Sequence, residues 1–276
     1  MRRLLAGVAL AAMMPALAAA AEANTLTEEE KAAGWELLFD GKSLDKFIDP
    51  SKLNPPGDAW HLDGDTIAAK PHAFITEDLI SKETFGDFEM EWDWKISPGG
   101  NSGVKYLIQA LPVLTRATAK PGARRFEDHV DYALNQGATD RSVIAPGSRA
   151  QIYVVGFEYQ MIDNHRHPDA LRGPLYQTGA LYGLFAPPED VTKPVGEFNH
   201  SRLVVRGNHV EHWLNGVKVV DASLDDPRVK ETLDERWGVG SPVAHLLTGR
   251  PRKQCPVSLQ NHGNAVWFRN IKIRRL

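Results

Sequence analysis

Residues 88–96 alternate strictly between apolar and charged side chains, which constrains the fold more than any other feature of the sequence. The apolar positions are Phe88, Met90, Trp92, Trp94 and Ile96, and the charged ones are Glu89, Glu91, Asp93 and Lys95. Successive side chains of a β-strand point to opposite faces, so the apolar set is buried together only if the segment is a strand. We therefore expect Trp92 and Trp94 between two sheets, with Glu91 and Asp93 on an outer or concave face.

The rest of the chain shows many short strand patterns joined by tight turns. Asp63-Gly64-Asp65 predicts a hairpin, and Gly207-Asn208 and Asn215-Gly216 predict turns that join three successive strands. Further strands are expected at 35–39, 60–62, 66–69, 104–109, 153–162, 180–184, 203–206, 210–214, 218–220, 257–260 and 266–273. Strands linked by turns rather than by crossover helices predict an all-β fold, an antiparallel β-sandwich of the jelly-roll type.

Two long stretches interrupt this rhythm. Residues 111–150 are polar and rich in Pro, Gly and Arg, so we expect an elaborated loop with about one helical turn. Residues 224–237 have helical spacing and are expected to lie across the surface of the sandwich. Loops of this length inside a compact domain are more often functional than accidental.

The first 21 residues are expected to be a cleaved signal peptide. Arg2 and Arg3 precede an apolar run, and small residues at 18–21 suit a signal peptidase. A membrane anchor is the alternative, but Pro15 and the weak alanine tail argue against it. The lone Cys255 excludes an internal disulfide and lies far from the cleavage site, so no lipid-bearing N-terminal cysteine forms. These features predict a protein of the bacterial periplasm or exterior.

The remaining residues, 22–276, fit one large β-sandwich domain. The formal net charge is −3 and acidic and basic residues are well mixed. The chain has no basic stripe of the kind that binds nucleic acid, so a nucleic-acid partner is not expected.

The segment 157–164 is the most informative for function. In a strand, Glu158 and Gln160 project from one face, and a carboxylate beside an amide on a concave face is a natural sugar-binding pair. Asp163 follows at the strand end, where a bulge or loop could aim it at the same cleft. The alternative is that Glu158 faces solvent and Asp163 caps a turn, because any half-exposed strand shows polar alternation.

Several histidines have a chemical and a structural interpretation. His262 lies beside a glycine turn between two strands, where it could transfer protons near neutral pH or simply bond its own loop. His165, His167 and Asp169 match no firm metal-binding spacing, so exposed loop residues are the favoured interpretation. Trp213 indicates the core face of the strand 210–214, which would place His212 on the opposite face.

Six blocks in order resemble the bacterial 3-keto-disaccharide hydrolase family, long known as a domain of unknown function. They are GWELLFDGKSLDKF, FGDFEMEWDWKISPGGNSGVKY, FEYQMIDN, TGALYGLFAP, HVEHWLNGVKVVD and SLQNHGNAVWFRNIKIRRL. The resemblance covers residues 34–276 apart from the insertions at 111–150 and 224–256. It implies a jelly roll similar to concanavalin-type lectins and glucanases, and an exported protein of sugar-degrading bacteria.

The resemblance also implies a reaction. A ketone at C3 of a sugar acidifies the C2 hydrogen, so a base can remove that proton while another group stabilises the enolate and an acid protonates the leaving oxygen. Elimination and water addition then cleave the glycosidic bond of a 3-keto-glycoside. By the family pattern, the catalytic candidates are Glu158, Asp163 and His262, and the substrate-binding candidates are Asn101, Lys105 and Gln160. No cofactor is demanded, and a divalent metal ion in the enolate role is left open.

Two other functions compete with this one. A non-catalytic, lectin-like carbohydrate-binding module is the main alternative, since the fold hosts lectins as readily as enzymes. A retaining glucanase needs two carboxyl groups about 5–5.5 Å apart, but here Glu158 is followed by Gln160. The family reading predicts that Glu158, Asp163 and His262 line one pocket.

Overall fold

The computed structural model describes residues 22–48, 59–71, 75–139, 144, 150–250 and 254–276. The signal peptide expected at residues 1–21 lies outside the described residues. Within them, no helix is both long and apolar enough to cross a membrane.

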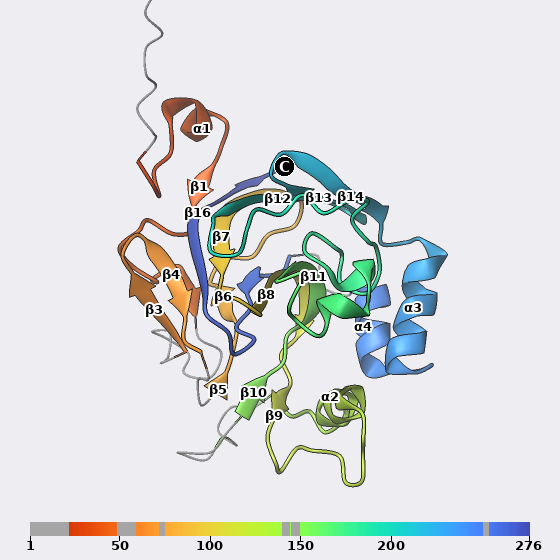
Figure 1. The fold of residues 1–276 in the computed structure, drawn as a ribbon. Coiled ribbons are helices and arrows are strands. Elements are labelled where there is room, and N and C mark those ends of the chain that lie inside the picture. The colour runs from red at the N-terminus through yellow and green to blue at the C-terminus, as the bar shows by residue number, and fades with distance from the viewer. Residues whose placement is uncertain (1–21, 49–58, 72–74, 140–143, 145–149, 251–253) are drawn as a thin grey trace, which may run out of the picture.

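Two antiparallel sheets form the layers of the molecule and confirm the predicted β-sandwich (Figure 1). The larger sheet has the order β14 (Val217–Ser223), β13 (His209–Leu214), β12 (Asn199–Arg206), β7 (Phe88–Ile96), β16 (Val266–Arg275), β4 (Thr66–Ala69) and β3 (Trp60–Asp63), with β1 (Glu36–Leu37) also on β16. The second sheet has the order β11 (Val155–Ile162), β8 (Asn101–Ala110), β15 (Ser258–Leu259), β6 (Leu79–Ser81) and β2 (Phe47–Ile48). A small third sheet joins β5 (Ile75–Thr76), β10 (Ala150–Ile152) and β9 (Val113–Leu114).

Strand β7 lies at the centre of the large sheet and buries its aromatic side chains as predicted. Trp92 and Trp94 are fully buried. Trp94 donates its indole N–H to Ser201 Oγ at 2.8 Å. Trp92 packs edge-on against Tyr159 of β11 with ring centroids 5.1 Å apart, so the two sheets meet through this aromatic pair.

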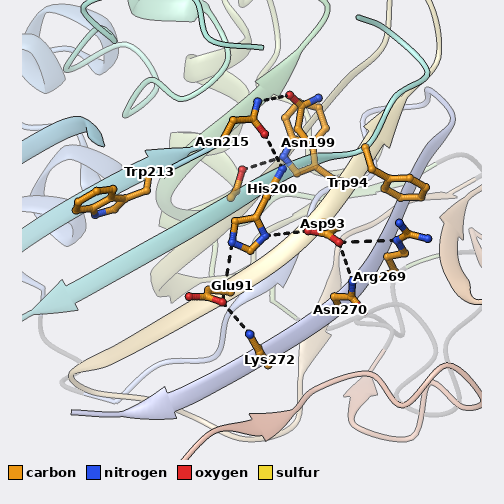
Figure 2. A network of polar contacts seen from close by, with 12 residues as sticks. Glu91, Asp93, Trp94, Asn199, His200, Trp213, Asn215, Arg269, Asn270 and Lys272 are labelled. Atoms are coloured by element: carbon orange, nitrogen blue, oxygen red, sulfur yellow. Dashed lines mark hydrogen bonds and ion pairs between the residues drawn. The ribbon is translucent and has the colours of Figure 1, made fainter. Parts of the chain in front are cut away.

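The charged face of β7 is the outer face of the sandwich, where its carboxylates are paired with basic side chains (Figure 2). Glu91 Oε2 lies 2.9 Å from Lys272 Nζ, and Asp93 Oδ1 lies 2.8 Å from His200 Nδ1. Asp93 also accepts a hydrogen bond from the Asn270 amide at 2.7 Å. These alternating carboxylates hold neighbouring strands together and line none of the cavities described below, which argues against the glucanase interpretation.

The segment 180–184 is not a regular strand, contrary to the expectation. It makes only isolated bridges, between Leu181 and Tyr159 and between Leu181 and Phe185. Gly179 and Gly183 flank it with φ values of 88° and 72°. Those left-handed conformations turn the chain twice within five residues, which prevents a continuous ladder.

The interruptions of the strand pattern contain helices. Residues 111–150 hold α2 (Phe126–Asn135), longer than the single turn expected, and residues 224–256 hold α3 (Pro227–Trp237) and α4 (Pro242–Gly249). Each presents an apolar stripe to the core, such as Val229, Leu233 and Trp237 on α3. Capping defines the starts of the last two, because Asp226 and Ser241 accept backbone N–H bonds. Beside these, α1 (Glu28–Ala32) precedes the sandwich, and short 3₁₀ helices occupy Ala170–Arg172 and Pro174–Tyr176.

The expectation that Trp213 marks the core face of β13 is wrong. His212, on the opposite face, points into the core. Its Nε2 lies 2.9 Å from the Tyr106 hydroxyl and its Nδ1 lies 3.0 Å from the Gly179 carbonyl oxygen. Tyr106 belongs to β8, so this contact also joins the two sheets. Burial lowers the pKa of His212 to about 4, which keeps the imidazole neutral near pH 7.

We predict that His212 contributes to acid sensitivity. Its folded-state pKa lies below the value of 6.5 in an unfolded chain, so folding loses stability as pH falls from about 6.5 to about 4. The shift corresponds to up to about 3 kcal/mol. The variant His212→Gln should be less stable at neutral pH but show a flatter fall of unfolding free energy over that range.

Urea unfolding at a series of pH values measures this difference. His245→Gln, at an exposed position of α4, is the matched control for removing a histidine. An unchanged pH dependence in His212→Gln would show that the imidazole is not kept neutral by the core.

Candidate functional site

The middle of β11 lines a cavity of about 400 Å³, here called the Glu158 cavity. Five of the six residues predicted from sequence line it: Glu158, His262, Asn101, Lys105 and Gln160. Asp163 does not.

Strand register places the central side chains. Glu158 on β11 is paired with Lys105 on β8, and Gln160 is paired with Gly103. Glu158 and Gln160 are two residues apart, so both point to the cavity side of the sheet. A Cβ on Gly103 would lie 2.8 Å from Glu158 Oε1, so this glycine leaves the space that the carboxylate occupies.

Lys105 lies between two carboxylates. Its Nζ is 3.5 Å from Asp78 Oδ2, and Asp78 also accepts a hydrogen bond from Ser258 Oγ at 3.0 Å. Burial by itself would lower the pKa of Lys105, but the charges of Asp78 and then Glu158 outweigh it and raise that pKa. The cavity therefore contains a fixed ammonium group.

Glu158 is a carboxyl group suited to accept protons near neutral pH. Removal from water raises its pKa from 4.5 to about 7, and the positive charge of Lys105 limits the rise. Apolar residues contribute to this desolvation, because Phe157, Leu184 and Trp237 line a small space together with Glu158. A general base is most effective when its pKa is close to the working pH.

Three amide side chains in the cavity have polar atoms that need a partner. Asn101 Oδ1, Gln160 Nε2 and Gln260 Oε1 are buried without a hydrogen-bond partner among the described residues. Buried polar atoms are nearly always hydrogen-bonded, so such atoms facing a cavity point to a hydroxyl-rich ligand.

His262 lies at the rim of the cavity. Its ring contacts that of His167 edge-on, with centroids 6.0 Å apart. The residue as a whole is exposed, but the surrounding protein removes water from its ring. This desolvation and then the charge of Lys105 lower the pKa of His262, so the imidazole is neutral at pH 7.

Tyr182, Asp169 and Arg236 also line the cavity and were not among the predicted site residues. The Tyr182 hydroxyl donates to Asp169 Oδ2 at 2.9 Å, and the Arg236 guanidinium lies 5.2 Å from the Tyr182 ring centroid. Burial raises the pKa of Tyr182, so the phenol stays protonated. Tyr182 lies within a recognised sequence block, whereas Arg236 comes from the second insertion and carries no local signal.

The prediction that Asp163 shares the pocket of Glu158 and His262 is wrong. Its carboxylate accepts the backbone N–H groups of Gly99 at 2.8 Å and His165 at 3.1 Å, and it lines a different cavity. These bonds outweigh burial and lower the pKa of Asp163. Asp163 is an odd number of residues from Glu158, and no bulge reverses its direction, so it points to the opposite side of the strand.

The described residues contain one group of three side chains close enough to share a metal ion, namely His209, Glu211 and Asp221 on the outer face of the large sheet. Lys218 forms ion pairs with both carboxylates of that group, so its ammonium already balances part of their negative charge. The His, Asp and Glu side chains described in the Glu158 cavity form no such group.

Comparison with known proteins identifies the family. Residues 34–274 match the model of the 3-keto-alpha-glucoside-1,2-lyase-like domain, so the chain belongs to that family. It is 27% identical over 271 residues to a 3-keto-disaccharide hydrolase of Bacteroides thetaiotaomicron, an alignment that covers 93% of this chain and 83% of the relative.

Solved structures agree with this assignment. A candidate glycosyl hydrolase of Parabacteroides distasonis superimposes with a TM-score of 0.66 and 26% identity, covering 92% of this chain and 100% of that one. A second protein of that organism has a TM-score of 0.54 and 24% identity, covering 88% and 99% of the two chains, and supports the fold alone.

We predict that the environment of Glu158 reduces stability above neutral pH. Its folded-state pKa exceeds the unfolded value, so the cost of burying the ionised carboxylate appears as pH rises from 4.5 to about 7. The variant Glu158→Gln should therefore gain stability over the wild type by up to about 3 kcal/mol above pH 8, and the gain should vanish near pH 4.

Thermal and urea unfolding of both proteins across this range measure the difference. Glu91→Gln, on the outer face of β7, removes a carboxylate that is paired with Lys272 and should show no such gain. A Glu158→Gln variant that is equally destabilised at every pH would contradict the assigned environment.

Proposed function

We propose that this protein cleaves the glycosidic bond of 3-keto-glycosides by removal of the C2 proton and elimination. The observation that carries the proposal is the juxtaposition of Glu158, whose pKa is raised to about 7, with the Lys105 ammonium in a polar cavity. Family membership and the name of the Bacteroides relative support the same substrate class.

Glu158 acts as the base in this mechanism. Its ionised carboxylate takes the C2 proton, and the electron pair of the broken C–H bond moves toward the C3 ketone to form an enolate. The ammonium of Lys105 stabilises the negative charge that develops on the ketone oxygen, because it is held in place by Asp78 and partly removed from water.

The enolate then expels the oxygen attached to C1. That oxygen needs a proton, and the Tyr182 hydroxyl or a water molecule near His262 can supply it. Addition of water across the resulting C1–C2 double bond returns a proton to C2 and gives a free 3-keto sugar. Asn101 and Gln160 bind ring hydroxyl groups through their unpaired amide atoms.

The sequence features at the N-terminus support a further part of the proposal. Residues 1–21 act as a cleaved signal peptide, and residues 22–276 work as one exported domain outside the bacterial cytoplasm.

The mechanism predicts dependence on the ketone and labelling at C2. A plain disaccharide should be inert, because its C2 hydrogen is too weakly acidic, whereas the 3-keto derivative should be cleaved. In heavy water, mass spectrometry and NMR should find deuterium at C2 of the sugar product, beyond exchange in an enzyme-free control. A lectin-like module would cleave neither compound, and rapid cleavage of the plain disaccharide without labelling would refute the mechanism.

Two carboxylate variants, at Glu158 and at Asp163, distinguish the proposed base from a carboxylate that lies outside the cavity. Glu158→Gln should lower kcat by about 10²–10⁴-fold with little change in binding, because a glutamine cannot accept the C2 proton. Wild-type kcat/KM should rise with pH through about 7 as Glu158 ionises.

Asp163→Asn is the control, since its side chain holds backbone N–H groups outside the cavity. It should lower the melting temperature but keep kcat within a factor of about 3. Loss of activity in Asp163→Asn alone, with Glu158→Gln active, would reverse the assignment.

A further inference from the structure

A second cavity of about 580 Å³ adjoins the Glu158 cavity and is here called the Tyr176 cavity. The two cavities share three lining residues, Asp169, Tyr182 and Arg236. The walls of the Tyr176 cavity come from the 3₁₀ helices near Tyr176, from the start of α2 and from α3. Both long insertions therefore contribute to a compartment beyond the catalytic candidates.

The shared residues form a hydrogen-bonded boundary between the compartments. Tyr182 donates to Asp169 at 2.9 Å, and Asp169 Oδ1 accepts from Arg172 Nη1 at 2.8 Å. Arg236 stacks near Tyr182 and forms an ion pair with Glu127 at 3.5 Å. Tyr182 is a candidate proton donor to the oxygen at C1 and lines both cavities, so a glycoside held with that oxygen at Tyr182 would extend its leaving group into the Tyr176 cavity.

The charges that line the Tyr176 cavity balance. Its three arginines are Arg125, Arg172 and Arg236, and its three carboxylates are Glu127, Asp169 and Glu235. Arg172 also covers the Tyr176 ring, with the guanidinium carbon 3.8 Å from the centroid, and Tyr176 meets Tyr182 edge-on at 5.4 Å. Balanced charges around aromatic rings suit a neutral ring with hydroxyl groups better than an anion.

We propose that the Tyr176 cavity binds the leaving group of the substrate and selects uncharged rings over anionic ones. The shared chemistry is an uncharged ring whose face can pack against the aromatic side chains of Tyr176 and Tyr182, supplied by a second sugar or by a phenol. This inference rests on the proposed function, because it takes the Glu158 cavity as the place of the 3-keto ring.

Thr232→Trp tests the proposal, because residue 232 lines the Tyr176 cavity from α3 and an indole there would narrow the cavity. Glu231→Trp, at the preceding exposed position of the same helix, is the matched control. Four 3-keto-glucosides are compared, with a methyl, a phenyl, a neutral sugar and a uronic acid leaving group.

In the wild type, kcat/KM should be at least about tenfold higher for the neutral sugar or the phenyl leaving group than for the uronic acid. Thr232→Trp should remove about tenfold from those two substrates and leave the methyl glucoside within about twofold, whereas Glu231→Trp should change none of them. The sugar and phenyl arms show which source of the ring is preferred. Equal losses on all four substrates, or no loss at all, would overturn the proposal.

A binding measurement distinguishes failure of the proposed function from failure of the proposal for the Tyr176 cavity. If no 3-keto-glucoside is cleaved, the proposed function fails, and calorimetry with plain glucosides carrying the same leaving groups still tests the Tyr176 cavity. Weaker binding of the disaccharide to Thr232→Trp than to Glu231→Trp would uphold the cavity as a ring-binding site, and equal binding would refute it. Tyr176→Ala, checked by its melting curve, replaces Thr232→Trp if that variant does not fold.

Discussion

Tyr159 packs edge-on against Trp92 between the two sheets, and its ring also stacks near His212 with centroids 4.5 Å apart. This contact orients β11, because a strand with Tyr159 in the core must turn Glu158 and Gln160 to the other side. A slip of one residue would place a carboxylate and an amide in the apolar core and expose the tyrosine. The sandwich core and the polar cavity therefore depend on the same register.

The charge arrangement of the cavity follows from that register. Lys105 is opposite Glu158 on β8, and β8 is paired on its other side with β15, whose Ser258 bonds Asp78. A buried ion pair between two partners alone contributes little to stability after desolvation. Here a single ammonium lies near two carboxyl groups, and burial raises the pKa of both Asp78 and Glu158 although the charge of Lys105 opposes the rise. The ionised form of Glu158 therefore costs stability, and the same raised pKa suits the proposed role of Glu158 as a base near neutral pH.

The two insertions add walls to one face of the second sheet and so form a cavity there. Their helices pack apolar residues such as Leu233, Trp237 and Leu247 into the common core, which removes water from behind Glu158. The same helices supply Arg236 to the boundary between the two cavities. The helices of the two insertions therefore contribute both to the raised pKa of Glu158 and to the shape of the Tyr176 cavity.

The sequence by itself determined the layers, the central strand 88–96 and the face of β11 that carries Glu158 and Gln160, because period-two alternation is local and is enforced by burial. It also contained the ordered blocks that identified the family, and Lys105 and His262 lie within two of those blocks. Only the tertiary structure decided the place of Asp163, whose direction depends on how the chain leaves β11. Tertiary structure likewise brought Asp169, Tyr182 and Arg236 together, since contacts between residues up to 67 positions apart leave no periodic signal.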